Sequence, residues 1–171
     1  MKIFRPMRRH RQQLSTGECI RILKEATSGV LALLGDGGYP YAVPLSHVYD
    51  GGRIYFHSAR EGHMVDAVRR HGRASFCVIG RDDVRGREYT TLFRSVIAFG
   101  RIRIIDDADE KLKAARMFGG RFNPDDEEAL QNELEKGFSH MLMLCFDIEH
   151  LTGKEAVELV REGKAGSPGG Q

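Results

Sequence analysis

The segment that decides the fold is residues 38–66, Gly-Tyr-Pro-Tyr-Ala-Val-Pro-Leu-Ser-His-Val-Tyr-Asp-Gly-Gly-Arg-Ile-Tyr-Phe-His-Ser-Ala-Arg-Glu-Gly-His-Met-Val-Asp. Its alternating side chains predict two strands on either side of a turn at Asp50 to Gly52. A short polar stretch then leads from the second strand to a helix that we expect to open at Gly62. The segment therefore predicts a β-hairpin that delivers its second strand to a helix start.

The alternation assigns each side chain of the hairpin to one face, because successive residues of a strand point to opposite sides. One face of the first strand carries Tyr41, Val43, Leu45, His47 and Tyr49. In the second strand, one face carries Ile54, Phe56 and Ser58, and the opposite face carries Arg53, Tyr55 and His57.

The end of this hairpin is the best candidate site in the chain. A helix start such as Gly62 has free backbone N–H groups and the positive end of the helix dipole, which together suit a phosphate. His57 and Ser58 come just before it and add an imidazole and a hydroxyl group. The pattern thus indicates an anion site beside a polar strand end.

The composition is that of an ordinary globular protein. The 171 residues are 41% hydrophobic and 29% charged, and this length suffices for one domain with a substantial core. We expect a single domain over residues 1–162, of which residues 1–13 form a basic N-terminal arm. Residues 163–171 are rich in Gly, Ser and Pro and are predicted to be a disordered tail.

Several classes of protein are disfavoured by simple patterns. No apolar run approaches the roughly 20 residues of a membrane span, so we expect no membrane partner. The first residues lack the apolar core of a signal peptide, which predicts a cytoplasmic protein. The three cysteines, Cys19, Cys77 and Cys145, are odd in number and far apart, which argues against a disulfide framework or a structural zinc site.

Charge and histidine placement leave two alternatives open. The basic arm could contact nucleic acid, but the net charge is only +2 and no aromatic platform accompanies the arm. We therefore expect no nucleic-acid partner. His47 and His57 on neighbouring strands could reach one metal ion, but no acid or cysteine is placed with them, so we expect no metal.

The remaining chain adds strands and peripheral helices. Helices are predicted from the capping box Ser15–Glu18 to about Thr27, over 62–71, over 108–118, from Asn123 onward, and from a capping box at Thr152 to Val160. Strands are predicted over 29–34, 38–49, 53–58, 73–79, 89–105 and 141–148, with a charged loop at 80–88. No repeated strand–helix–strand rhythm occurs, which favours a mainly β fold, a six-stranded antiparallel barrel with surrounding helices.

Five motifs in this order give the chain a recognisable resemblance. They are Thr27-Ser-Gly-Val-Leu-Ala-Leu, Pro40-Tyr-Ala-Val-Pro-Leu-Ser, Ile54-Tyr-Phe-His-Ser-Ala with Glu61-Gly-His, Phe93-Arg-Ser-Val-Ile-Ala-Phe-Gly, and Thr152-Gly-Lys-Glu-Ala. The chain resembles the pyridoxamine 5′-phosphate oxidase-like flavoproteins, which are FMN-binding split β-barrels. Within them it is most similar to the 5-nitroimidazole-resistance branch.

The resemblance implies a homodimer with FMN in a groove between the subunits. Carried over by position, the implied cofactor-binding residues are Val43, Pro44, Leu45, Ser46, His57, Ser58, Ala59, Gly62, His63, Arg94, Ser95 and Val96. Gly62 and His63 would meet the phosphate, and Arg94 to Val96 would approach the ring system from the same or the partner subunit. His57 is the candidate catalytic residue, because an imidazole can orient a substrate or supply a proton after hydride transfer.

Two departures qualify the resemblance. Relatives often carry a lysine at or beside position 63, where this chain has a histidine that is not a fixed cation. Arg60 or Arg69 would then have to compensate. The chain also lacks the arginine-rich C-terminal motif of true pyridoxamine-phosphate oxidases, which argues against pyridoxal phosphate synthesis.

Two functions remain as expectations. The first is an FMN-dependent oxidoreductase that passes two electrons to a small-molecule acceptor, such as a nitro-aromatic of the 5-nitroimidazole type. The second is a non-catalytic binding module of the same fold, or one that binds or processes haem. The colour of the purified protein distinguishes them.

Overall fold

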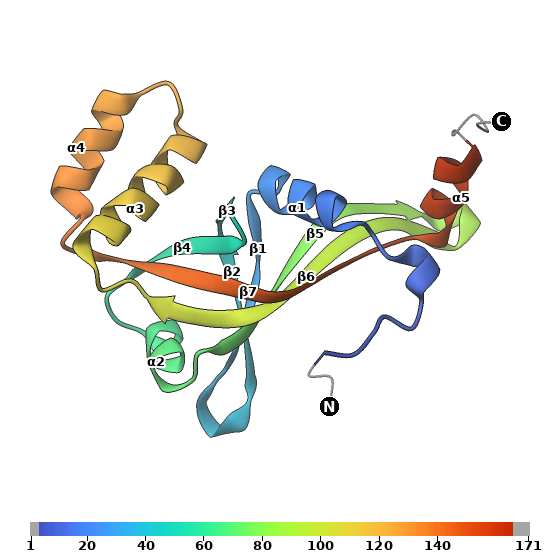
Figure 1. The fold of residues 1–171 in the computed structure, drawn as a ribbon, viewed down its shortest axis with the longest axis horizontal. Coiled ribbons are helices and arrows are strands. Elements are labelled where there is room, and N and C mark those ends of the chain that lie inside the picture. The colour runs from blue at the N-terminus through green and yellow to red at the C-terminus, as the bar shows by residue number, and fades with distance from the viewer. Residues whose placement is uncertain (1–3, 166–171) are drawn as a thin grey trace.

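The computed structural model describes residues 4–165 and contains one seven-stranded antiparallel sheet in the order β2-β1-β5-β6-β7-β4-β3 (Figure 1). The strands are β1 Ser28–Leu34, β2 Pro40–Ser46, β3 Val48–Asp50, β4 Arg53–Ala59, β5 Arg73–Arg85, β6 Thr90–Ile104 and β7 Met141–Glu155. The two outer strands, β2 and β3, do not pair with each other, so the sheet is not closed. The predicted mainly β, antiparallel split barrel is confirmed, with one strand more than expected.

The additional strand arises because the predicted strand 38–49 is interrupted at His47. Residues before it pair with β1, and residues after it pair with β4. The backbone N–H of His47 donates to the carbonyl oxygen of Thr27 at 3.3 Å, and its ring Nε2 lies 2.8 Å from the carbonyl oxygen of Leu23. His47 therefore marks the point where the chain leaves one edge of the sheet for the other.

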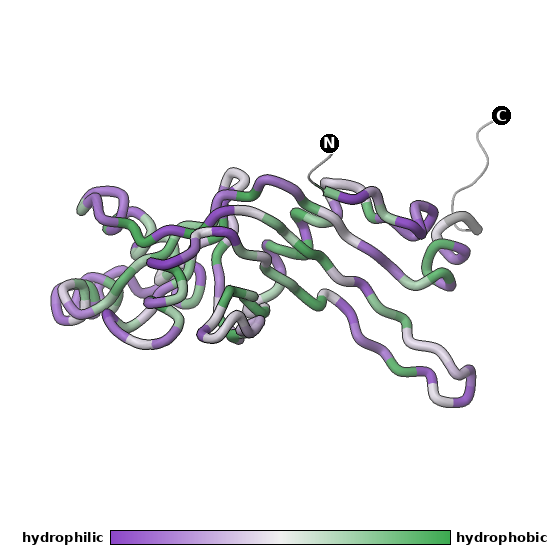
Figure 2. Tube along the Cα trace, turned by 90° about the horizontal axis from the view of Figure 1, so that it is seen from below, coloured by the Kyte–Doolittle hydropathy of each residue, from purple (hydrophilic) through white to green (hydrophobic). Residues whose placement is uncertain are grey.

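The main core lies inside the curved sheet. It is built from inward-facing strand residues, together with residues of helices α1 (Thr16–Glu25) and α2 (His63–Arg70). Figure 2 shows how apolar and polar residues follow one another along the chain. Among the side chains with no exposed surface are Leu23, Leu31, Ile54, Phe56, Phe76, Val78, Val96, Ala98, Leu144 and Phe146. Full burial of one such side chain contributes about 1.5–3 kcal/mol to stability.

A second core forms where helices α3 (Ala108–Phe122) and α4 (Glu127–Gly137) cover the other face of β4 and β7 at one end of the sheet (Figure 1). Tyr55 and Cys145 face this core, while their neighbours Ile54 and Phe146 face the main one. Strand β4 is therefore buried on both of its faces.

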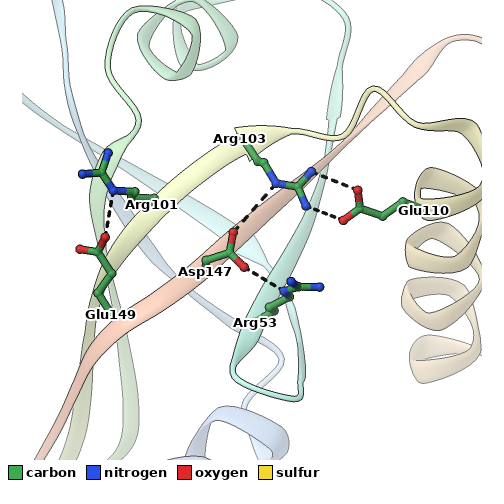
Figure 3. Close-up of polar contacts among 6 residues, drawn as sticks. All are labelled: Arg53, Arg101, Arg103, Glu110, Asp147 and Glu149. Atoms are coloured by element: carbon green, nitrogen blue, oxygen red, sulfur yellow. Dashed lines mark hydrogen bonds and ion pairs between the residues drawn. The ribbon is translucent and has the colours of Figure 1, made fainter.

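A row of exposed ion pairs crosses these strands (Figure 3). Asp147 of β7 accepts from the Arg53 side chain at 2.8 Å and lies 3.9 Å from the Arg103 guanidinium, which in turn pairs with Glu110 at 2.5 Å. Such solvent-exposed pairs add little stability individually. Because Glu110 belongs to the first turn of α3, the row aligns the start of that helix with β6 and β7.

The predicted loop at 80–88 is wrong, because β5 continues to Arg85 and forms a long hairpin with β6. The register shifts between Ile79 and Arg81, and a short 3₁₀ turn, Gly86–Glu88, closes the hairpin. Most residues of this part of β5 are exposed to solvent. This part of β5 therefore lacks the alternation of apolar and polar residues by which a strand is predicted from sequence.

The predicted helix from Thr152 is also wrong at its start. Strand β7 runs to Glu155, and helix α5 occupies Val157–Ala165. Lys154 pairs with Ser95 of β6, so the residues that carry the capping pattern continue strand β7 and do not start a helix. Gly153 is required here, since a side chain at this position would lie 2.5 Å from the Cys19 sulfur. Residues 163–165 of the predicted tail are thus helical, and residues 166–171 lie outside the described residues.

The other helix predictions differ only at their ends. The capping box of α1 is confirmed, because Ser15 and Glu18 exchange hydrogen bonds of 2.9 and 3.2 Å. Helix α3 extends to Phe122, and α4 begins at Glu127 with Asp126 as its cap, not at Asn123. Within residues 4–165, no helix combines the length and apolarity needed to cross a membrane.

We predict that Gly100→Ala lowers the free energy of unfolding by about 2 kcal/mol, because a Cβ atom at this bulge would overlap the carbonyl oxygen of Asp147. Urea denaturation followed by circular dichroism measures the change. Gly86→Ala is the matched control, since a Cβ atom there meets open space. Equal stability of the two variants would contradict the tight backbone contact at Gly100.

We also predict that acid weakens the fold through His47. Burial lowers the pKa of this imidazole, and the Arg121 guanidinium lowers it further, although the hydrogen bond to Leu23 opposes the shift. The ring donates from Nε2 to a carbonyl oxygen, so Nδ1 is the unprotonated atom, and it has no hydrogen-bond partner. Protonation of Nδ1 would bury an unpaired N–H group.

The unfolded chain takes up this proton below a pH of about 6.5, whereas the folded chain resists it. The stability is therefore complete above that pH and falls below it, by at most about 1.4 kcal/mol per pH unit. Urea denaturation at pH 7.5 and 5.5 should show a larger loss for the wild type than for His47→Gln. Equal losses would show that another group controls the acid response.

Candidate functional site

The predicted residues of the hairpin and of the following helix lie around the open side of the sheet. Strands β2 and β4 are in contact there, although they do not pair. The start of α2 joins them, since the ring of His63 stacks on Tyr41 with centroids 4.1 Å apart. The structure thus brings together the three segments that carry most of the predicted site.

The four predicted residues of β2 alternate as expected. Val43 and Leu45 are half-buried and face inward, and Leu45 packs against the main core. Pro44 and Ser46 are exposed on the outer face of the sheet. A ligand on that outer face could contact the latter two side chains directly.

The predicted phosphate position has suitable backbone geometry. Gly62 adopts φ +130°, a conformation that a residue with a side chain rarely takes, and no side chain caps the helix that follows. The first N–H groups of α2 are therefore not capped by a side chain. Gly62 itself is exposed.

His63 is less suited to a phosphate than the sequence predicted. Its Nε2 lies 3.6 Å from a carboxylate oxygen of Asp36, which is also paired with Arg70 at 2.5 Å. These partners keep the pKa of Asp36 below its usual range, first through the hydrogen bond from Arg70. A phosphate beside His63 would therefore meet an ionised carboxylate.

The two arginines expected to compensate for the missing lysine have other contacts. Arg60 donates to the carbonyl oxygen of Ser139 at 3.0 Å, in the loop between α4 and β7. Arg69 lies 3.8 Å from a carboxylate oxygen of Asp66. The structure shows neither guanidinium committed to the start of α2.

The predicted residues of β6 lie apart from the others. The register of the pairing places β1 and β5 between β2 and β6, so Val96 is separated from Leu45 by two strands. The side chain of Val96 is completely buried in the main core, and only its backbone remains for a ligand. Arg94 pairs with Glu155 at 3.0 Å. One chain alone does not bring these residues to the β4 end of the site.

His57, the predicted catalytic residue, is exposed and faces helix α3. Its ring meets Phe118 edge-on, with centroids 4.7 Å apart. The two residues lie at a pocket of about 440 Å³ between the helical pair and the strands beneath it. Its lining consists of His57, Ala115, Phe118, Gly119, Leu130, Glu133, Leu134, Gly137, His140, Met141 and Met143.

The sequence interpretation missed the contribution of α3 and α4 to this pocket. One signal was present, the pair Gly119-Gly120 within a helical pattern, since glycine in a helix interior usually has a packing reason. A side chain at position 119 would overlap Leu130 of α4. The absence of a side chain at Gly119 therefore leaves room for Leu130 against α3.

The outer face of the sheet carries exposed apolar side chains from three neighbouring strands, β1, β5 and β6. Val30, Ile79, Ile97 and Phe99 expose 39%, 65%, 39% and 38% of their surface. Phe4 of the N-terminal arm packs on this face, where its ring lies 5.7 Å from that of Phe99 and stacks on His150 with centroids 4.6 Å apart. We call the four exposed residues the outer apolar patch.

His47 and His57 do not share a site. His47 is buried against Leu23 and Phe76, whereas His57 is exposed beside Phe118. Within residues 4–165, no three side chains among His, Cys, Asp and Glu gather closely enough to hold a metal ion. The chemistry available at the candidate site is that of imidazole, hydroxyl and backbone N–H groups around apolar surface.

Comparison with solved structures supports the fold. The chain is similar to an FAD-binding protein from Mesorhizobium loti, with 25% identity, a TM-score of 0.59, and 84% of this chain and 96% of the other covered. It is also similar to an FAD and haem binding protein from Mycobacterium smegmatis, with 21% identity, a TM-score of 0.73, and coverage of 93% and 82%.

A third similar structure is a candidate 5-nitroimidazole antibiotic resistance protein from Bacteroides thetaiotaomicron, with 18% identity, a TM-score of 0.67, and coverage of 83% and 85%. At identities of 21% and 18%, the similarity to the last two structures shows the fold alone. A search of curated proteins found no significant match. The family model described as pyridoxamine 5′-phosphate oxidase matches residues 15–155. The chain therefore belongs to the pyridoxamine 5′-phosphate oxidase family.

Proposed function

We propose that this protein is an FMN-dependent oxidoreductase that works as a homodimer, with its cofactor between the two copies. The observation that carries the proposal is the outer apolar patch, because it lies in the same sheet face as the exposed cofactor candidates Pro44 and Ser46. Two of the similar proteins are described as FAD-binding, which supports a flavin in this fold.

A second copy of the chain accounts for the patch. Four apolar side chains exposed on one sheet face are typical of an interaction surface. Ser95 of β6 and Ser46 of β2 lie near its ends, so a partner on this face would meet candidate residues from both strands. A dimer through this face would also bring Ser95 and the neighbouring backbone of β6 in one chain toward the site of the other.

The residues present fit a flavin in most respects. Pro44 and Ser46 would border the ring, and the N–H groups at the start of α2 would meet the phosphate. When bound, FMN supplies the two-electron redox chemistry. The carboxylate of Asp36 beside His63 disfavours a phosphate at that imidazole, so we assign the phosphate to the backbone of residues 62–65.

His57 would donate a hydrogen bond or a proton to the electron acceptor. A neutral imidazole offers one N–H donor, and a protonated one can release a proton to a reduced substrate near neutral pH. Two electrons and two protons convert a nitro group to a nitroso group and water. A nitro-aromatic is therefore the acceptor class that we propose, in agreement with the resemblance to the 5-nitroimidazole-resistance branch.

A haem-binding module is the second candidate. His57 and His140 line the same apolar pocket, and imidazole is a usual axial ligand of haem iron. One similar protein is described as binding both FAD and haem. An absorbance spectrum separates the candidates, because flavin and haem absorb in different bands.

We predict that the purified protein keeps flavin bands after FMN is added and excess is washed away, at a molecular mass twice the 19.2 kDa of one chain. Light scattering after size exclusion measures the mass. Ile97→Lys should weaken the dimer at least tenfold and release FMN, because it places a charge in the outer apolar patch.

Leu112→Glu is the matched control, since Leu112 is similarly exposed, at 37%, but lies on α3. It should keep both the dimer and the flavin. A monomeric wild type that retains FMN would refute the shared site, and a Soret band without flavin bands would favour the haem module.

We predict that His57→Ala keeps the dimer but lowers turnover of a nitro-aromatic, measured per bound FMN, by roughly 100-fold, the lower range for loss of a general acid. Stopped-flow absorbance measures reoxidation of the reduced protein by the acceptor. His71→Ala is the control, because His71 is an exposed histidine at the end of α2. Unchanged turnover in His57→Ala would remove this residue from the mechanism.

A further inference from the structure

We infer that the pocket beneath α3 and α4 binds the electron acceptor, and that it selects neutral, planar aromatic compounds. This inference rests on the proposed function and goes beyond it, because the helical pair took no part in the predicted cofactor site. The pocket, of about 440 Å³, lies within the size range of small-molecule sites. We call it the α3–α4 pocket.

The floor of the pocket is sheet and the roof is helix. His57 of β4 pairs with Met143 of β7, and Ala59 pairs with Met141, so both methionines present their side chains on the same side as His57. Phe118 and Leu130 close the opposite side. A flat layer of apolar groups on each side suits a planar ligand, and thioethers contact aromatic rings favourably.

The walls are held in place before any ligand binds. Glu110 ties the start of α3 to Arg103 at 2.5 Å, and Arg121 near its end donates to the carbonyl oxygen of Ala26 at 2.6 Å (Figure 3 shows the first of these). Lys111 donates to the carbonyl oxygen of Phe138 at 2.6 Å, in the loop that closes the pocket. A ligand therefore meets a largely preformed site and orders few side chains.

Helix α4 is held against α3 as well. Arg116 pairs with Glu127 at 2.6 Å and donates to Gln131 at 2.5 Å. Gly119 permits Leu130 to approach α3 closely, since any side chain there would overlap it. The close approach of Leu130 to Gly119 and the two contacts of Arg116 therefore act together to position α4 over the pocket.

The polar groups of the lining define the charge of the ligand. They are the imidazoles of His57 and His140 and the carboxylate of Glu133, and no lysine or arginine lines the pocket. Each neutral imidazole can donate one hydrogen bond, which suits the oxygen atoms of a nitro group. The carboxylate disfavours an anion, so the pocket favours a neutral acceptor.

The test measures equilibrium binding to the oxidised, FMN-loaded protein without an electron donor, so that no turnover occurs. Backbone amide shifts in NMR titrations report the site and the Kd for two probes of nearly equal shape, neutral 4-nitrobenzamide and anionic 4-nitrobenzoate. We expect shifts at α3, α4 and the start of β7, and weaker binding of the anion.

Leu130→Trp should fill the pocket and raise the Kd of 4-nitrobenzamide at least tenfold, while FMN stays bound. Leu112→Trp is the matched control on the same helical pair, since Leu112 lies outside the α3–α4 pocket, and its Kd should not change. Glu133→Lys is a second variant at an exposed position and should improve binding of 4-nitrobenzoate two- to fivefold relative to 4-nitrobenzamide.

Shifts confined to the outer sheet face, or an unchanged Kd in Leu130→Trp together with no change of preference in Glu133→Lys, would overturn the inference and leave the proposed function intact. A protein that retains no FMN would overturn both. Added haemin that displaces the probe, with a Soret band that His140→Ala abolishes, would reassign the pocket to haem.

Discussion

The burial of β4 on both faces is the constraint on which the rest of the structure depends. Ile54 and Phe56 of this strand are completely buried in the main core, and Tyr55 between them is 7% exposed in the second core. A strand in this position needs a cover on each side. The sheet curves around one face, and the helical pair α3 and α4 must cover the other. His57 follows directly in the same strand, so the cover that protects Tyr55 also builds a pocket beside the candidate catalytic group.

The hairpin of residues 38–66 could be predicted from sequence because its local patterns agree with its surroundings. The turn at Asp50, the alternation of β4 and the helix after Gly62 are all present. Two predictions failed where long-range pairing prevailed. Thr152 carries a helix-capping pattern but belongs to β7, and the charged residues 81–85 form a strand because β6 offers each of them a partner. Local patterns do not report such partners.

The candidate site could be predicted only in part for a similar reason. The family motifs identified the segments that surround the open side of the sheet, but not the contacts among them. The proximity of His63 to Asp36 depends on the fold of the turn at 36–38, and the α3–α4 pocket depends on the fit of Leu130 against Gly119. These contacts join residues whose spacing in the sequence has no typical pattern. The contacts of the proposed second copy of the chain could not be predicted either, because motifs within one chain do not show which surfaces meet between copies.

The two unpaired edges of the sheet limit how copies of this chain can associate. Strand β3 has only three residues, and β2 contains Pro40 and Pro44, which have no N–H group to offer another strand. Short and proline-containing edges are the usual protection against the uncontrolled strand addition that leads to fibrils. The open side of the split barrel therefore offers few backbone N–H groups to which another strand could pair. Such edges disfavour continuous edge-to-edge sheets built from many copies of the chain.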